Sequence, residues 1–267
     1  MTNSSRFSLQ GKVALITGAS RGIGRSAALA FAEAGADVAL ASRKQEDLEK
    51  VAAEIKTLGR KALPVAAHTG KLDEIRKLVE TVVNQFGRID ILVNNAGGSP
   101  ATASCLDAEE RLWDTIMNLN LKGVYFLSQL AARVMKEHGG GTIINVASVS
   151  GFKPEYKNGI YSIAKSGVTM LTKSMALELA QFNIRVNAIA PGSIMTKLLS
   201  GNWQGLPEDM AKIVQSYAAG MSPMNRIADP DEISGAMLYL ASDASSYTTG
   251  ETIVIDGGML CGTVTMR

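Results

Sequence analysis

The chain of 267 residues has few of the side chains that build disulfide, metal or triad chemistry. It holds two cysteines, Cys105 and Cys261, and two histidines, His68 and His138, and these four lie apart from one another in the sequence. A disulfide framework, a metal site and a Ser-His-Asp triad are therefore not expected. Both cysteines are predicted to be free thiols in a reducing compartment.

Long apolar runs and an excess of one charge are also absent. No stretch reaches the ~18 to 20 apolar residues that a membrane span needs, and the first eight residues lack the apolar centre of a signal peptide. The formal net charge is only +2, and no run of Lys or Arg forms a basic patch. We therefore expect a cytoplasmic protein that has neither nucleic acid nor a membrane as its partner.

What the chain does contain is an alternation of short β-branched apolar runs with longer amphipathic segments. The runs are predicted to be strands and span 13–16, 37–41, 62–67, 89–93, 142–146, 185–189 and 252–255. The segments between them are long enough for crossover helices, at 23–34, 45–57, 73–86, 108–137, 161–181 and 230–241. This order predicts an α/β protein with a doubly wound, seven-stranded parallel sheet flanked by helices, which is a Rossmann fold.

The domain organisation is expected to be simple. With 46% apolar and 19% charged residues, the chain can bury one large core, and no linker or repeat divides it, so 1–267 is predicted to form a single domain. The stretch 193–227 interrupts the alternation with mixed Gly, Pro, Met and polar residues. We interpret it as a lid over a substrate pocket.

A glycine-rich segment follows the first predicted strand directly. Its residues Gly18, Ser20, Arg21, Gly22, Ile23 and Gly24 lead into the first predicted helix. Glycines allow a tight turn and a close approach of pyrophosphate, and a helix N-terminus offers free amide hydrogens and the positive end of a dipole. A glycine triplet alone can be a mere turn, but its place between a strand and a helix is typical of a dinucleotide site.

The end of the second predicted strand indicates which dinucleotide binds. An Asp or Glu there would hydrogen-bond the ribose of NAD, whereas this chain has Ser42 and Arg43. Arg43 can pair with the 2′-phosphate of NADP, Ser42 can donate to it, and Arg21 can add a second cation. NADP is therefore predicted, with NAD as the less favoured cofactor. Alternatively, Arg43 is only a solvated charge at a helix start.

Candidate acid-base chemistry lies in the helix predicted at 161–181. Tyr161 and Lys165 are four residues apart and so share one face of that helix. A neighbouring ammonium and a positively charged oxidised nicotinamide both favour the phenolate, so Tyr161 can exchange a proton with a substrate. Ser148, at the end of a strand, can donate to the substrate oxygen, and Asn120 can hold a water that links Lys165 to solvent. A Tyr and a Lys at this spacing are otherwise common on helix surfaces.

Taken together, these motifs resemble the short-chain dehydrogenase/reductase family over residues 7–258. The likeness is carried by the segments 17–24, 94–97 (Asn-Asn-Ala-Gly) and 120–123 (Asn-Leu-Lys-Gly), by Ser148, by Tyr161-x-x-x-Lys165 and by Pro191-Gly192. It implies an Asn-Ser-Tyr-Lys tetrad of Asn120, Ser148, Tyr161 and Lys165. It also implies that Lys165 holds the nicotinamide ribose, and it places at the cofactor Tyr161, Asn94, Ala96, Gly97, Pro191, Gly192, Ile194 and Thr196.

The chain departs from the family pattern after the third predicted strand. Many members carry an Asp-Val pair beside the adenine at this point, where this chain has His68-Thr69-Gly70. His68 and Thr69 are candidate adenine contacts. His68 either donates to the ring or lies nearby without a function.

The resemblance implies an oxidoreductase that moves a hydride between NADP(H) and a ketone or secondary alcohol, most similar to 3-oxoacyl and carbonyl reductases. One alternative is an NAD-dependent dehydrogenase of the same fold that acts on an alcohol, polyol, sugar or hydroxysteroid. Another is a binding protein that senses NADP without turnover. The family also implies a homotetramer, or a homodimer, built through the helices at 108–137 and 161–181 and the strand at 252–255. Substrate choice is expected to lie in 98–106, 150–159 and the lid.

Overall fold

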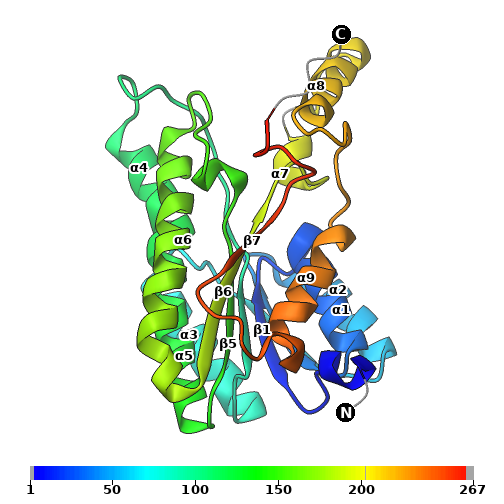
Figure 1. The fold of residues 1–267 in the computed structure, drawn as a ribbon, viewed down its shortest axis with the longest axis vertical. Helices are drawn as coiled ribbons and strands as arrows, with labels where there is room; N and C mark the ends of the chain where they lie inside the picture. Colours follow the sequence, from blue (N-terminus) through cyan, green and yellow to red (C-terminus); the bar gives the residue numbers. More distant parts are fainter. Residues whose placement is uncertain (1–2, 202, 263–267) are drawn as a thin grey trace.

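A seven-stranded parallel sheet forms the centre of the computed structural model, which describes residues 3–201 and 203–262 (Figure 1). The strand order is β3-β2-β1-β4-β5-β6-β7, and every neighbouring pair is parallel. The predicted Rossmann fold is thereby confirmed. The strands are β1 (Val13–Thr17), β2 (Asp37–Ser42), β3 (Ala62–Ala66), β4 (Ile91–Asn94), β5 (Gly141–Val146), β6 (Ile184–Pro191) and β7 (Thr252–Ile255).

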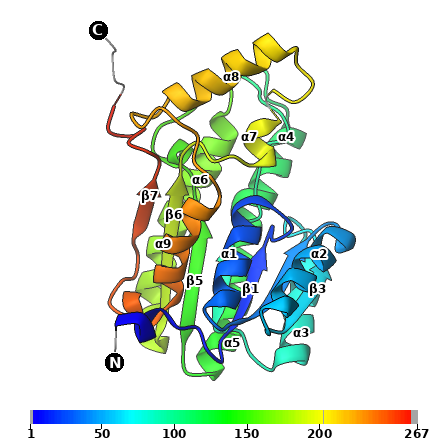
Figure 2. The ribbon, with the colours of Figure 1, turned by 90° about the vertical axis from the view of Figure 1, so that its right-hand side faces the viewer.

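Helices cover both faces of the sheet, which explains why its central strands are largely apolar. On one face α1 (Gly22–Glu33), α2 (Gln45–Thr57) and α9 (Asp231–Ala241) contribute to one buried core, which includes Phe31. On the other face lie α3 (Leu72–Phe86), α5 (Gly123–Glu137) and α6 (Gly159–Leu179), as Figures 1 and 2 show. Alternate β1 residues serve the two cores: Ile16 packs in the first and Leu15 in the second.

The helix predicted at 108–137 is interrupted in the structure. It consists of α4 (Glu110–Met117), a π-helical turn at Asn118–Lys122, and α5. The side-chain amide nitrogen of Asn120 donates to the backbone carbonyl of Ile116 at 2.8 Å. This bond competes with the regular backbone hydrogen bonds of the helix. Gly123 ends the turn against the carbonyl oxygen of Thr69, where an added Cβ would lie only 1.9 Å away. Such π-turns are frequent at functional sites.

A buried amide network ties the sheet to the helices on the α6 side. The Asn94 amide donates to Asn145 Oδ1 and to Ser128 Oγ, each at 2.8 Å, and the Asn145 amide donates to Thr172 Oγ1 at 3.0 Å. These four residues come from β4, β5, α5 and α6 and are all buried. Because a buried amide must be hydrogen-bonded, the network fixes α6 relative to the carboxyl ends of the strands.

The segment 193–227, interpreted from the sequence as a lid, contains two helices that the sequence analysis did not predict. These are α7 (Lys197–Ser200) and α8 (Glu208–Gly220), which lie beyond the carboxyl edge of the sheet (Figure 2). The two ends of the segment meet in a bridge, in which the amide of Met195 donates to the Ala228 carbonyl at 2.8 Å. The segment therefore leaves the sheet edge and returns to it, with its two ends held together by the bridge.

Cys105 and Cys261 are free, as predicted, and both are exposed. Within the ranges 3–201 and 203–262, no helix has the length and apolar character to cross a membrane.

Candidate active site

The turn between β1 and α1 needs glycine at three positions for two different reasons. Gly18 and Gly22 have φ angles of +64° and +56°, a region that side chains with a Cβ rarely adopt. Gly24 lies inside α1, but a Cβ there would come within 2.4 Å of the Gly18 carbonyl oxygen. The turn therefore folds back tightly on the first helical residues and leaves their amide groups at the edge of the sheet.

The first turn of α1 has the features of an anion site. Arg21 occupies the N-cap position, and neither its side chain nor any other caps the helix. The amide hydrogens of Gly22, Ile23 and Gly24 precede the first internal helical bonds, so they remain free to donate to a phosphate. Ser20, half-buried just before them, and the exposed Arg21 lie in the same turn.

Asn95 holds this turn in place, a role that the sequence interpretation did not assign to it. Its amide nitrogen donates to the carbonyls of Thr17 at 2.8 Å and of Gly18 at 3.2 Å. Asn94, proposed as the cofactor-side residue, turns instead into the buried network with Asn145. The signal that distinguishes them is strand alternation, because adjacent residues at the end of β4 point to opposite faces.

The end of β2 contains a buried polar atom that lacks a partner. Ser42 Oγ is shielded from solvent and makes no hydrogen bond. Arg43, the next residue, is exposed, and neither it nor Arg21 forms an ion pair with a described residue. An orphaned hydroxyl costs free energy unless a ligand satisfies it, so the residues present fit a dinucleotide whose ribose end lies here.

The loop after β3 has a local structure of its own. The backbone amide of His68 donates to Glu74 at 2.7 Å, and its ring Nδ1 accepts from the Gly70 amide at 3.0 Å. His68 Nδ1 is thus an acceptor, which leaves the hydrogen on Nε2 as the ring donor. Thr69 is buried with its carbonyl against Gly123. Adenine contact by His68 and Thr69 stays a prediction.

Tyr161, Ser148 and Lys165 come together at the carboxyl end of β5. Tyr161 and Lys165 lie on the first turns of α6, with Lys165 Nζ 5.5 Å from the centre of the Tyr161 ring. The Tyr161 hydroxyl is hydrogen-bonded to Ser148. Lys165 is buried and donates to the carbonyl of Val146, the last residue of β5, at 2.7 Å. Strand and helix therefore present one phenol and one hydroxyl side by side.

The electrostatics of this group differ from the sequence expectation. Burial, assisted by the negative charge of Glu155, raises the pKa of Tyr161 to about 12, against a smaller lowering by the Ser148 hydrogen bond. Burial also lowers the pKa of Lys165 to about 8. Lys165 was expected to depress the Tyr161 pKa, but in this structure desolvation dominates. At neutral pH the phenol carries its proton.

Asn120, on the π-turn, locks the loop that faces Lys165. Its side chain exchanges two hydrogen bonds with the backbone of Gly98, both at 2.9 Å. A Cβ on the neighbouring Gly97 would lie 2.8 Å from Asn120 Oδ1 and 3.3 Å from Lys165 Nζ. Gly97 is therefore the small residue around which the amide and the ammonium approach each other. Ala96 precedes it and donates its backbone amide to Thr17 Oγ1 at 3.0 Å.

The chain after β6 runs beside the glycine turn. Gly192, the residue after Pro191, packs closely against Asp256. A Cβ added to Gly192 would lie 2.8 Å from the Asp256 backbone. Ile194 is buried in the α1-side core. Thr196 caps α7, and its methyl group lies 3.1 Å from the position that a Cβ on Gly22 would take. The start of the lid thus touches the glycine turn.

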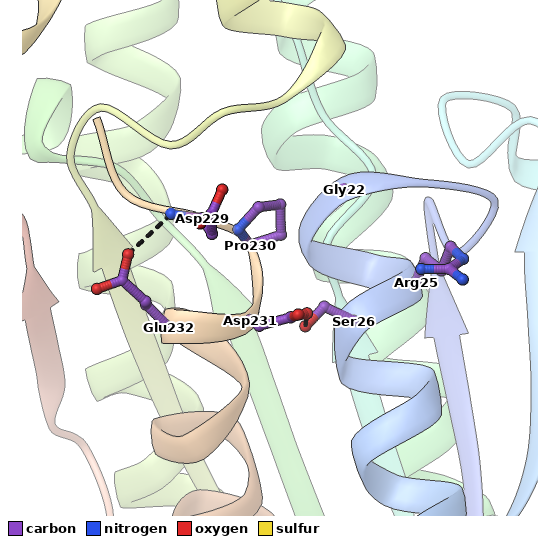
Figure 3. Close-up of a pocket in the computed structure, with 7 residues that line it drawn as sticks. All are labelled: Gly22, Arg25, Ser26, Asp229, Pro230, Asp231 and Glu232. Carbon is purple, nitrogen blue, oxygen red and sulfur yellow. Dashed lines mark hydrogen bonds between the residues drawn. The ribbon is translucent and has the colours of Figure 1, made fainter. Parts of the chain in front are cut away.

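A pocket of about 510 Å³ adjoins the glycine turn on the outer side of α1 (Figure 3). It lies between the N-terminal ends of α1 and α9, and Ser26 there donates to Asp231 at 2.6 Å. Three carboxylates, those of Asp229, Asp231 and Glu232, line it. This charge disfavours a pyrophosphate inside the pocket, although its lining residue Gly22 belongs to the glycine turn. Among the residues that the structure describes, no cluster of His, Cys, Asp or Glu suits a metal ion.

These elements define a class of protein. A doubly wound sheet binds dinucleotides at the point where the strand order reverses, here between β1 and β4. The glycine turn lies on one side of that point, and the Tyr161, Ser148 and Lys165 group lies at the end of the next strand, β5. The fold and the site thus belong to the nicotinamide-dependent oxidoreductases with a single Rossmann domain.

Comparison with known proteins gives the family. A family model described as enoyl-(acyl carrier protein) reductase matches residues 18–260. The 3-oxoacyl-(acyl-carrier-protein) reductase FabG of Thermotoga maritima is 41% identical over 94% of this chain and 99% of its own length. The chain belongs to the short-chain dehydrogenase/reductase family, whose members are oxidoreductases acting on CH-OH and C=O groups of small molecules.

Solved structures of relatives agree with the fold. A gluconate 5-dehydrogenase from Burkholderia cenocepacia, in complex with NADP and tartrate, superimposes with a TM-score of 0.90 at 33% identity, covering 98% of this chain and 100% of the other. A 7α-hydroxysteroid dehydrogenase complexed with NADH and 7-oxo glycochenodeoxycholic acid gives a TM-score of 0.88 at 32% identity, with coverages of 97% and 98%. Both cofactors therefore occur among the relatives.

The geometry of Gly24 gives a test of the predicted cofactor turn. Gly24→Ala would place a methyl group against the Gly18 carbonyl and 2.5 Å from Asn95 Nδ2, so the turn must open. We expect the affinity for the nicotinamide cofactor to fall about tenfold or more, measured by fluorescence titration. Gly235→Ala on α9 is the matched control, because nothing lies within 4 Å of an added Cβ there. Unchanged affinity in Gly24→Ala would contradict the assignment.

Proposed function

We propose that the protein is an NADPH-dependent carbonyl reductase of the 3-oxoacyl type. The observation that carries this proposal is the group of Tyr161, Ser148 and Lys165 at the carboxyl end of β5, in which burial raises the pKa of Tyr161 to about 12. A phenol that holds its proton at neutral pH is poised to donate it, as reduction of a ketone requires. The bound cofactor supplies the hydride. Tyr161 then gives its proton to the substrate oxygen, Ser148 hydrogen-bonds that oxygen, and Lys165 and Asn120 lie behind the phenol toward the Gly97 loop.

NADP is proposed over NAD because of the charges at the end of β2. Ser42 Oγ lacks a partner, and the Arg43 and Arg21 guanidinium groups are free of ion pairs with described residues. A 2′-phosphate would satisfy all three groups, whereas NAD would leave the cations unpaired. Because relatives use either cofactor, these local charges carry the argument.

The side chains around the site favour a substrate with an apolar part. Phe152, Met195 and Leu198 expose large apolar surfaces on the loop after β5 and at the start of the lid. Leu198 lies 3.7 Å from the position that a Cβ on Gly98 would take, so α7 borders the loop after β4. Apolar side chains on such a lid can pack against an acyl or alkyl chain. We infer that the lid covers the substrate.

A second candidate is the oxidation of a sugar acid or hydroxysteroid, since the two superimposed relatives carry those names. A panel of ketones and alcohols, assayed with NADPH, NADH and their oxidised forms, separates the two candidates. A preference of tenfold or more for NADH would contradict the first. A binding protein without turnover is the remaining alternative.

Substitution of Tyr161 tests the proton transfer. Tyr161→Phe removes the hydroxyl and keeps the ring, so kcat on the best ketone should fall about 10²- to 10⁴-fold, while the affinity for NADPH changes little. Tyr156→Phe is the matched control, because Tyr156 is exposed on the preceding loop. If Tyr161→Phe retained the wild-type rate, the proposed proton transfer by Tyr161 would be contradicted.

Substitution of Arg43 tests the cofactor choice. Arg43→Asp replaces the proposed phosphate partner by an acid that repels the 2′-phosphate and can bind a ribose hydroxyl. The ratio of kcat/KM for NADPH over NADH should fall about 10²-fold, because a charge-assisted pair becomes a repulsion. Lys56→Asp, at the other end of α2, makes the same change of charge and should leave the ratio unaltered. An unaltered ratio in Arg43→Asp would contradict the proposed contact between Arg43 and the 2′-phosphate.

We propose that the protein forms a homotetramer in which the exposed face of α6 contacts a second copy of the chain. Val168, Leu171 and Met175 are buried within the chain, whereas Ile163, Met170 and Leu177 are 52%, 63% and 83% exposed at seven-residue spacing. Such an apolar stripe on a helix suits a contact with a second copy. Light scattering should give a tetramer, and Leu177→Lys should shift it to smaller species. A monomeric wild type at working concentration refutes the assembly.

A further inference from the structure

Glu155 places a negative charge beside the catalytic group, and the proposed proton transfer does not use it. Its Oε1 accepts from Ser150 Oγ at 2.6 Å, and its Oε2 accepts from the side-chain amide of Asn158 at 2.9 Å. Ser150 is buried, and its Oγ lies 3.1 Å from Ser148 Oγ. The carboxylate is therefore fixed in position, with one serine side chain between it and the hydroxyl that is proposed to bind the substrate oxygen.

Glu155 has no cation as its partner among the residues that the structure describes. Lys153 and Lys157 are exposed in the same loop, and Lys157 Nζ lies over the ring of Tyr156, 5.5 Å from its centre. The charge of Glu155 does act on the catalytic group, because it contributes to the raised pKa of Tyr161. A substrate bound at that phenol would lie in the same electrostatic field.

The loop offers hydrogen-bond acceptors at this point. An ionised carboxylate only accepts, and Asn158 Oδ1, on the amide that holds Glu155, is shielded from solvent and has no partner. A carboxylate on the substrate would bring a second negative charge and more acceptors to this place, which is unfavourable. An ester or thioester brings no charge, and the exposed ring of Phe152 in the same loop can pack against its apolar part.

We propose that Glu155 is a specificity-determining residue that disfavours keto acids whose carboxylate lies close to the ketone, and so selects uncharged ketones such as the esters and thioesters of 3-oxo acids. The proposal rests on the proposed function, because it concerns the substrate of the same site. The hydride still goes to the carbonyl carbon and the Tyr161 proton to the carbonyl oxygen. Glu155 acts only on the charge that the substrate carries next to them.

The test compares ethyl acetoacetate with acetoacetate, which share the carbon skeleton around the ketone and differ in charge. The measured quantity is the ratio of kcat/KM for the ester over the acid. In the wild type this ratio should be about tenfold or more. In Glu155→Gln, which removes the charge and nearly keeps the shape, it should fall about fivefold or more, because the acid is no longer repelled.

Two further variants serve as controls. Glu155→Asp keeps the negative charge and should retain most of the wild-type ratio. Lys153→Gln changes one exposed charge in the same loop and should not lower the ratio. Thermal unfolding and NADPH affinity are measured for every variant to confirm that it is folded. A wild type that prefers the acid, or a ratio in Glu155→Gln equal to that of the wild type, overturns the proposal.

Ionic strength gives a measurement that needs no substitution. Salt screens the repulsion between two carboxylates, so the wild-type ratio of ester over acid should fall about twofold or more between low and high potassium chloride concentration. The ratio in Glu155→Gln should depend less on salt. If Glu155→Gln does not fold, the wild-type measurement decides, and a ratio independent of salt overturns the proposal.

Failure of the proposed function is recognised separately. If the protein prefers NADH, the same ratio is measured with NADH and still tests Glu155. If neither compound is reduced, their binding to the NADP-bound protein is compared by isothermal titration calorimetry. Tighter binding of the ester without turnover would contradict the proposed function and support the role of Glu155. Equal or tighter binding of the acid would rule out that role whatever the reaction.

Discussion

The hydroxyl of Thr17 joins the two loops on which the whole site depends. It is buried at the end of β1, donates to the Val93 carbonyl at 3.2 Å and accepts the amides of Asn95 and Ala96, each at 3.0 Å. One donor and two acceptors are all that a hydroxyl offers, so its capacity is used in full. The glycine turn and the loop after β4 are thereby held across the point where the strand order reverses.

The catalytic group depends on a second set of buried polar contacts. Asn145 and Asn94 fix α6 and α5 against the strands, and Asn120 fixes the Gly98 loop in front of Lys165. Each of these amides would cost free energy if it were left unpaired, which makes their arrangement unique. The position of α6, which carries Tyr161, is therefore fixed by hydrogen bonds to the strands. The loop beside it is fixed by Asn120 of the π-turn. Burial raises the Tyr161 pKa and so gives a proton donor at neutral pH.

Much of this could be predicted from the sequence because the signals are local. The apolar runs match the strands to within a few residues, since strands buried on both faces need apolar side chains throughout. The glycine turn was recognisable because Gly18 and Gly22 adopt positive φ angles, which residues with a Cβ rarely adopt. The break at Asn118–Lys122 was missed, because it depends on a side-chain bond to Ile116 and on the approach of Thr69 to Gly123. The helices α7 and α8 were missed because Gly and Pro interrupt the periodicity around them.

The sequence by itself determined the fold class, the family resemblance and the residue types of the tetrad. The tertiary structure decided how those residues interact, since hydrogen-bond partners and burial depend on segments distant in the chain. It places Asn95 rather than Asn94 on the glycine turn, leaves Ser42 without a partner, and connects Ser148 to Glu155. It also reverses the expected pKa shift of Tyr161, because the desolvation of a phenol can be known only once the surrounding chain is in place.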